Sequence, residues 1–198
     1  MSKATENRYP RMTKLRKATT SVHDTLDARL IGEAPFASTN NYVLFLQFQH
    51  ALMHYVDPLY HCPKLASLIP DLQSRNRIDV LADDLQDFDA SAFTDAAQIT
   101  LDSMSLARSL GWLYVIEGSK LGAAMLGKEV SKLSLTSEFG ARFLAGPGVG
   151  RGNKWREFMA AIEAAPLTDL QEQELLDGAK QAFAYTHQLV DEMYQKAS

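Results

Sequence analysis

His23 and Arg16 are the first residues in this sequence whose types and spacing could hold a ligand. Apolar residues recur every three or four positions between residues 12 and 30, which is typical of an amphipathic helix. On such a helix His23 borders the apolar stripe, and Arg16 points the same way about 10 Å along the axis. The imidazole could ligate a metal, and the cation could pair with an acidic group, of the same flat ligand. A half-exposed histidine beside a surface arginine is the alternative interpretation.

The segment from residue 103 to 133 combines helical periodicity with four glycines, Gly111, Gly118, Gly122 and Gly127. A glycine inside a helix costs about 0.5–1 kcal/mol relative to alanine, so a structural or functional reason for each is expected. Gly118 and Gly122 are four residues apart and leave bare backbone on one side of the helix. Close packing of a second helix and close approach of a ligand both explain that side. A flat ligand between it and His23 would account for both features together.

Other candidate sites have less support. His50 and His54 are one helical turn apart, but no glutamate follows the first histidine as in HExxH, and Asp57 is the only nearby carboxylate. Diiron bundles need paired Glu-x-x-His motifs, which do not occur here. Cys62 is the only cysteine and has no base partner recognisable in the sequence, which favours an incidental thiol. The glycine-rich segment 146–152 follows no predicted strand, which favours a connector over a nucleotide-binding loop.

The elements that position these residues are predicted to be helices. Periodicity and capping residues predict helices over about residues 12–30, 39–59, 71–88, 103–133, 153–164 and 168–194, with a short piece at 137–144. Ser38 or Thr39 and Thr168 are the expected N-caps. No segment alternates with β-branched residues, so no sheet is expected. The sequence predicts one all-α domain over residues 1–198, with residues 1–10 as a disordered tail.

Composition excludes several classes of function. A net charge of −4 leaves no electrostatic footprint for nucleic acid or an anionic membrane. Residues 34–56 lack Asp, Glu, Lys and Arg but contain too many amides and histidines to cross hydrocarbon. The N-terminus has no apolar core of a signal peptide, and a single cysteine fits a reducing compartment. We expect a soluble, cytoplasmic, monomeric protein with no nucleic-acid or membrane partner.

Three segments together resemble the heme oxygenase family. RKATTSVHDTL, residues 16–26, looks like the family's proximal helix, in which a basic residue precedes the axial histidine by seven positions. GWLYVIEGSKLGAAML, residues 111–126, looks like its glycine-containing distal helix. AKQAFAYTHQL, residues 179–189, is similar to its C-terminal helix. With PFAS at 35–38 and DPLY at 57–60, the resemblance covers nearly the whole chain and is closest to small bacterial enzymes that take iron from host heme.

The resemblance implies that heme b, both cofactor and substrate, is sandwiched between the two helices. His23 would be the axial ligand of the heme iron, and Gly118 and Gly122 would let the distal backbone lie against bound oxygen. The other residues that it implies around the heme are Arg16, Thr19, Tyr114, Phe183, Arg156 and Tyr185, and Gln49 and Arg77 for the distal water network. Ser119 stands where the larger animal enzymes have a catalytic aspartate. The distal water must then be held by Arg77, Gln49 and carbonyl groups near Gly118.

The function implied by the resemblance is cleavage of heme to biliverdin, carbon monoxide and ferrous iron. It would use O2 and electrons from a ferredoxin or a flavin-type reductase, and would serve iron acquisition. Two alternatives stay open. A heme carrier or sensor of the same fold is favoured by Ser119, and a thiaminase-type hydrolase of the wider fold would need a cysteine nucleophile, for which Cys62 lacks a partner. The sequence fixes neither the electron donor nor the meso carbon that is cleaved.

Overall fold

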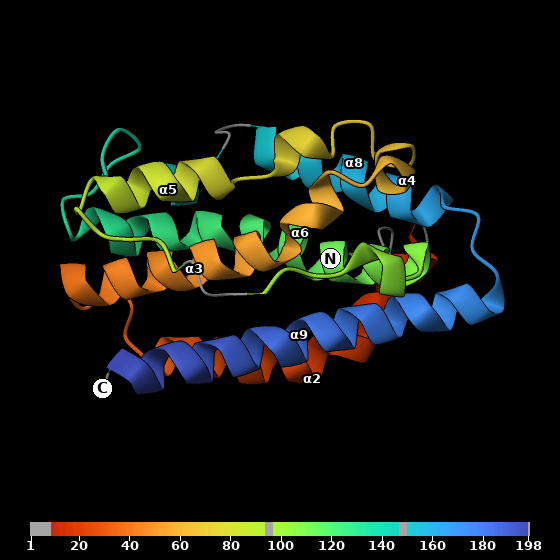
Figure 1. The fold of residues 1–198 in the computed structure, drawn as a ribbon, viewed down its shortest axis with the longest axis horizontal. Helices are drawn as coiled ribbons and strands as arrows, with labels where there is room; N and C mark the ends of the chain where they lie inside the picture. Colours follow the sequence, from red (N-terminus) through yellow and green to blue (C-terminus); the bar gives the residue numbers. More distant parts are fainter. Residues whose placement is uncertain (1–8, 94–96, 147–149, 198) are drawn as a thin grey trace.

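The computed structural model describes residues 9–93, 97–146 and 150–197, which form a helical protein (Figure 1). Within these ranges no strand occurs, and only isolated bridges link Thr136 to Phe139 and Gly140, so the predicted all-α class is confirmed. The elements are α2 (Pro10–Gly32), α3 (Thr39–Tyr60), α4 (Pro63–Ala66), η1 (Gln73–Arg75), α5 (Ile78–Gln86), η2 (Leu101–Ser103), α6 (Leu106–Ser131), α7 (Arg142–Ala145), α8 (Arg151–Ala164) and α9 (Asp169–Ala197).

Side-chain caps fix several helix starts. The Ser38 hydroxyl accepts a hydrogen bond from the Asn41 backbone N–H at 3.2 Å and caps α3. Thr168 and Gln171 form a reciprocal capping box at the start of α9: the Thr168 N–H donates to the Gln171 side chain at 2.9 Å, and the Gln171 N–H donates to the Thr168 hydroxyl at 3.4 Å. The predicted caps at these two starts are therefore confirmed.

Two predicted boundaries differ from the structure. The third helix does not begin at Asp71, because the Asp71 carboxylate binds the Arg75 side chain at 2.7 Å across the η1 turn, and α5 begins only at Ile78. At the N-terminus, Pro10 already belongs to α2 and Tyr9 is its N-cap, so these two residues are not part of a disordered tail. Residues 1–8, the rest of the predicted tail, lie outside the described residues.

The long helix α9 is the surface on which the site-bearing helices pack. Both α2 and α6 contact α9 along much of their length, and α3 contacts it more briefly. Helices α2, α6 and α9 all run from right to left in Figure 1, whereas α3 runs the opposite way. On the other side of the molecule, α8 contacts both α2 and α6, and α5 packs on α3. The proximal segment on α2 and the distal segment on α6 therefore run in the same direction, and both pack on α9.

Two glycines let α6 and α9 cross with their backbones in contact. A Cβ placed on Gly111 would lie 2.1 Å from the Leu175 carbonyl oxygen and 2.7 Å from the Ala179 nitrogen. A Cβ placed on Gly178 would lie 2.2 Å from the Arg108 carbonyl oxygen. Because backbone atoms of a helix cannot move aside as a side-chain tip can, only glycine fits at both positions. Helix packing therefore explains Gly111.

Helix α2 is tied down near its two ends. At its start, the backbone N–H of Arg11 donates to the Glu163 carboxylate of α8 at 3.0 Å, and the Arg11 side chain donates to Glu172 of α9 at 2.6 Å. Near its end, the Arg29 side chain donates to Asp191 of α9 at 2.8 Å. Between these ties, residues 20–25 are exposed. The middle of α2, which carries His23, is thus held in place without being covered.

Replacing Gly111 by alanine should destabilise the protein by about 3 kcal/mol, at the upper end of the usual range for overpacking, because the clash is with backbone. Gly32→Ala is the matched control, since a Cβ there meets nothing within 4 Å. It should change stability by less than about 0.5 kcal/mol. Urea unfolding followed by circular dichroism measures both. Equal midpoints for the two variants would contradict the packing role of Gly111.

Candidate functional site

His23 is presented to solvent from the middle of α2, with carboxylates behind one ring nitrogen. Its side chain is 55% exposed, and its Nδ1 lies 3.4 Å from an oxygen of Asp27 and 3.6 Å from one of Asp24. The ring packs edge-on against Phe183 of α9, with centroids 5.9 Å apart. Carboxylates at Nδ1 favour a proton on that nitrogen, which leaves the Nε2 lone pair free to bind a metal. The arrangement suits a histidine that ligates iron through Nε2.

Arg16, Thr19 and Tyr114, three of the predicted heme-contacting residues, come together one turn before His23. Tyr114 reaches from α6 toward α2, where its hydroxyl lies near Thr19 and in the field of Arg16. Burial raises the pKa of Tyr114, and the Thr19 hydroxyl and the Arg16 charge oppose that rise. The Tyr114 ring also packs near Trp155 of α8, at 6.1 Å between centroids. The contact between Tyr114 and Thr19 joins the proximal helix α2 to the distal helix α6 at one end of the site.

Gly118 and Gly122 lie beyond that contact on α6 and carry backbone that little covers. A Cβ on Gly118 would touch only the tip of the Trp155 ring, at 3.6 Å, and one on Gly122 would meet nothing within 4 Å among the described residues. Packing against a helix therefore does not explain these two glycines, unlike Gly111. Because α2 and α6 run the same way, His23 and Gly118 each lie one turn past the Thr19–Tyr114 contact (Figure 1).

Ser119 is exposed on α6, and its hydroxyl donates to the Ile116 carbonyl oxygen of its own helix at 2.8 Å. That bond fixes the direction of the hydroxyl and leaves the oxygen lone pairs to accept a hydrogen bond. Ser119 can thus accept a proton-donating group, such as water, but cannot supply a carboxylate.

Arg77 and Gln49 are not joined by a hydrogen bond in the part of the chain that the structure describes. Arg77 precedes α5, and its side chain donates to the Arg142 carbonyl oxygen at 2.9 Å. It borders a small hollow of about 110 Å³ that Lys120, Leu121 and Trp155 also line. Gln49 is half-buried on α3. The predicted shared role of these two residues in a distal water network stays a prediction.

The predicted heme contacts on α8 and α9 separate into different environments. Phe183 lies against His23, as the predicted role requires. Tyr185 instead stacks on Tyr55 of α3, with centroids 3.8 Å apart, and burial raises its pKa to about 12. Its ring is thus engaged with α3, away from the Arg16 cluster. Arg156 is exposed on α8 and donates to the Asn153 side chain, so its guanidinium is positioned by its own helix.

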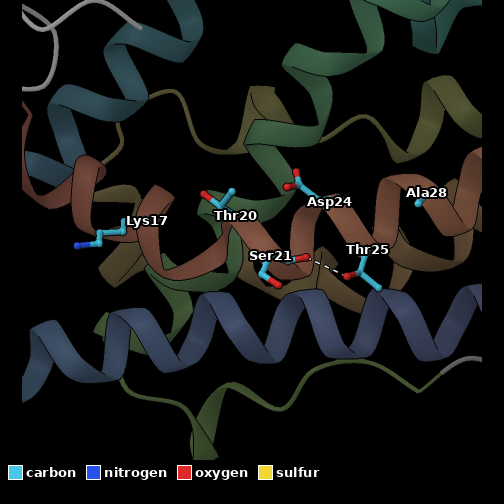
Figure 2. A pocket seen from close by; sticks show the side chains of 6 residues that line it. All are labelled: Lys17, Thr20, Ser21, Asp24, Thr25 and Ala28. Atoms are coloured by element: carbon cyan, nitrogen blue, oxygen red, sulfur yellow. Dashed lines mark hydrogen bonds between the residues drawn. The ribbon is translucent and has the colours of Figure 1, made fainter.

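A separate hollow follows the outer face of α2. Figure 2 shows the side chains that line it, and they all come from this one helix: Lys17, Thr20, Ser21, Asp24, Thr25 and Ala28. The Thr25 hydroxyl donates to the Ser21 carbonyl oxygen at 2.9 Å, so part of this face is satisfied internally. Neither His23 nor the glycines of α6 border it. This hollow is therefore distinct from the site between α2 and α6.

The weaker candidates from the sequence gain no support. Among the described residues, no group of three or more His, Cys, Asp or Glu side chains is placed to hold a metal ion, which includes His50 and His54. Cys62 is half-buried. No helix within the described ranges is long and apolar enough to cross a membrane.

Sequence reasoning missed several residues of the site. Asp27 follows His23 by four positions and so shares its helix face, a spacing that could have identified the acceptor for Nδ1. Trp155, whose ring tip touches the Gly118 position, comes from a distant helix and leaves no such local signal. Glu117 and Lys120 were also missed; they lie on the reverse of the glycine turn and are described below.

Comparisons with known proteins identify the family of the chain. Residues 11–192 match the family model described as heme oxygenase. The chain is 38% identical over 173 residues to heme oxygenase PigA of Pseudomonas aeruginosa, covering 87% of each protein. The fold matches the crystal structure of the NO- and CO-bound heme oxygenase from Neisseria meningitidis with a TM-score of 0.86 at 36% identity, over 92% of this chain and 91% of that one.

Fold and site together define a helical protein with an exposed histidine on one helix and bare glycine backbone on another, an arrangement that could hold a flat, iron-containing ligand. The residues present fit heme, since His23 offers a free Nε2, Phe183 an apolar surface beside it, and Gly122 an uncovered backbone. The chain belongs to the heme oxygenase family and is an enzyme of heme degradation.

Replacing His23 by alanine should abolish the absorption spectrum of histidine-ligated heme, because the iron loses its protein ligand. Unfolding free energy should change by less than about 0.5 kcal/mol, since the side chain is largely exposed. His187→Ala is the control, because His187 has the same spacing to an aspartate, with 3.3 Å from Nδ1 to Asp191. An unchanged heme spectrum in His23→Ala would refute the proximal assignment.

Replacing Gly122 by leucine should leave the heme-free protein as stable as the wild type, or more stable by up to about 1 kcal/mol, because leucine favours helix. Heme affinity should fall by about 10-fold or more, because the side chain fills the space over the turn. Heme titration and urea unfolding of the same sample measure the two effects. Loss of stability with intact heme affinity would show that Gly122 serves packing instead.

Proposed function

We propose that this protein cleaves heme to biliverdin, carbon monoxide and ferrous iron, using O2 and electrons from a ferredoxin or a flavin-type reductase. The observation that carries the proposal is the exposed His23 imidazole, with Asp27 at Nδ1, on a helix that runs in the same direction as α6, whose backbone at Gly118 and Gly122 little covers (Figure 1). Both similar proteins named above are called heme oxygenases, and both come from bacteria. Release of iron from heme in the cytoplasm, for use by the cell, is the role that we propose.

Each residue of the site would orient the substrate. His23 would bind the heme iron through Nε2, with Asp27 holding the ring by Nδ1. Arg16 lies on the same side of α2, where its guanidinium would pair with a heme propionate and so set the rotation of the ring in its plane. Tyr114 and Thr19 would close the site at that end. Phe183 would support the heme beside the imidazole.

The distal side would position oxygen by shape more than by charge. Heme supplies the redox chemistry when bound, and the protein supplies orientation and hydrogen bonds. At Gly118 and Gly122 the absence of side chains would let the α6 backbone approach the oxygen closely and direct it toward one meso carbon. The Ser119 hydroxyl donates its hydrogen bond to the Ile116 carbonyl oxygen. Its oxygen would therefore accept a hydrogen bond from the water that carries the proton needed for the reaction.

The proposal extends to the whole chain as one heme oxygenase domain, residues 1–198, acting as a monomer. The residues that we propose to hold the heme come from α2, α6 and α9 of a single chain, and α9 packs on both α2 and α6. One chain would therefore be sufficient to hold the heme.

A heme carrier or sensor of the same fold is the second candidate, favoured by Ser119 in place of a carboxylate. One experiment separates the two functions. Heme is titrated into the protein without oxygen, and then oxygen and a mild reductant or a ferredoxin donor are added with catalase present. Cleavage requires the Soret band of the bound heme to decay while the broad red band of biliverdin rises. A Soret band that survives these conditions would identify a carrier or sensor.

Replacing Arg16 by glutamate should weaken heme binding by about 10-fold or more, because a charge-assisted pair is exchanged for repulsion. It should also change the mixture of biliverdin isomers, since the propionate pair sets the ring rotation. Lys17→Glu is the control for net charge, as Lys17 lines the outer hollow of α2 (Figure 2). If both variants behave alike in heme titration and product chromatography, Arg16 does not hold a propionate.

A further inference from the structure

Glu117 and Lys120 lie on the reverse of the glycine turn and are buried there. They flank Gly118 and Ser119 in the sequence, yet their side chains point away from the open side of α6 and into the protein. The side chains are 6% and 16% exposed, and the Lys120 ammonium lies 2.6 Å from the Glu117 carboxylate. Two buried charges therefore sit behind the part of α6 that we propose to face oxygen.

The Lys120 ammonium uses all three of its donors. It donates to the Glu117 carboxylate, to the Tyr60 hydroxyl at 2.8 Å and to the Arg75 carbonyl oxygen at 2.7 Å. Tyr60 is fully buried at the end of α3 and donates in turn to Glu117 at 2.7 Å. Two of these acceptors, on Tyr60 of α3 and Arg75 of η1, lie outside α6. The lysine therefore restrains the position of α6 as well as its own charge, because moving α6 would break both of these hydrogen bonds.

Arg75 extends the network to two further elements. One of its Nη nitrogens lies 3.3 Å from the second oxygen of Glu117 and 3.1 Å from the Lys154 carbonyl oxygen on α8. Its Nε donates to Asp71 at 2.7 Å, ahead of η1. The turn of α6 that contains Gly118 is thus tied from behind to α3, η1 and α8 at once.

Such a network is a poor way to gain stability. Removing two charges from water costs several kcal/mol per ion, and their attraction and hydrogen bonds return little more than that. Burial lowers the pKa of Lys120, with Glu117 opposing, and raises the pKa of Tyr60 well above its usual range. A packed apolar cluster would stabilise the fold at least as well. What the charged network adds is a fixed geometry. It does so at a helix segment that is weakened by its glycines.

We infer that Glu117 and Lys120 are positioning residues for heme cleavage, which hold the Gly118–Gly122 turn at a fixed height and rotation over the heme. This inference rests on the proposed function, since it concerns how the same site directs oxygen to one meso carbon. Neither residue touches the substrate in this account. They act through the α6 backbone, and Tyr60 and Arg75 are the fixed points to which they attach it.

The chain supplies a matched control on the same helix. Glu129 and Lys132 have the same Glu-x-x-Lys spacing, and their charged groups are also 2.6 Å apart. Their side chains are 46% and 67% exposed, and within the part of the chain that the structure describes they make no hydrogen bond or ion pair with another element. An exposed pair of this kind contributes about 0–1 kcal/mol and should restrain nothing beyond its own turn.

The test compares Glu117→Gln with Glu129→Gln, and Lys120→Met with Lys132→Met. The first readout is amide hydrogen exchange of the heme-free protein over residues 117–122. In the buried-pair variants, protection of residues 117–122 should fall by about 10-fold or more. Without the network, this segment can open locally while the rest of the protein stays folded. Protection in α9 should remain. The exposed-pair variants should match the wild type in both segments.

The second readout is the heme complex of the same variants. In Glu117→Gln we expect an altered carbon–oxygen stretching frequency of carbon monoxide bound to ferrous heme, and a mixture of biliverdin isomers where the wild type gives one distribution. Heme affinity should stay within about threefold, because His23 and Arg16 are untouched. A role in stability alone would lower the unfolding midpoint and move neither the stretching frequency nor the isomer mixture.

Each outcome has one meaning. If a charge variant fails to fold, Tyr60→Phe replaces it, since it removes one hydroxyl and keeps the ring. Unchanged exchange over residues 117–122, or unchanged isomers and stretching frequency in a folded variant, overturns the positioning role. A wild-type protein that binds heme without cleaving it refutes the proposed function instead; the exchange and stretching measurements then still decide whether the pair positions the turn.

Discussion

The backbone contact between α6 and α9 is the constraint on which the site depends. Gly111 and Gly178 each face the other helix, so closely that a Cβ on either would meet backbone atoms of its neighbour at 2.1–2.2 Å. Helix α2 packs on the same α9, so the distance between α2 and α6 is set through their shared neighbour. Their direct bridge is the Thr19–Tyr114 contact, beyond which α6 turns uncovered backbone outward. A site for a flat ligand results from two helices held by a third.

Binding and stability draw on different parts of α2. The ends carry the ties, Arg11 to α8 and α9 and Arg29 to α9, whereas the middle turns with His23 remain exposed. An exposed imidazole contributes little to folding, which leaves its nitrogen available for a substrate that supplies its own apolar surface. The carboxylate of Asp27 is the one local addition, and it orients the ring. Heme would bury what folding leaves open.

Sequence reasoning succeeded where the signal is local and failed where it depends on a partner far along the chain. Apolar periodicity and the Ser38 and Thr168 caps gave the helices, because a helix forms from contacts within four residues. The resemblance predicts that His23 and Phe183 both meet the heme, and the two rings do lie together, although the heme contact itself stays a prediction. Spacing could not separate Gly111 from Gly122, since the reason for Gly111 lies on Gly178 of another helix. Likewise nothing in the sequence indicated that Tyr185 stacks on Tyr55 of α3, and its heme contact stays a prediction.

The Glu117–Lys120 and Glu129–Lys132 pairs show that sequence reasoning also misses a functional role that depends on distant partners. Glu117–Lys120 and Glu129–Lys132 are identical in residue type, spacing and charge separation, and a sequence reader would take both for solvent-facing pairs. Only the first meets Tyr60 and Arg75, which lie 57 and 42 residues from Glu117 along the chain. Because buried charges hold geometry at little gain in stability, such a network is expected where position matters more than strength. The network lies behind Gly118, on the turn that we propose to face oxygen, where a heme-cleaving enzyme would need a fixed backbone position.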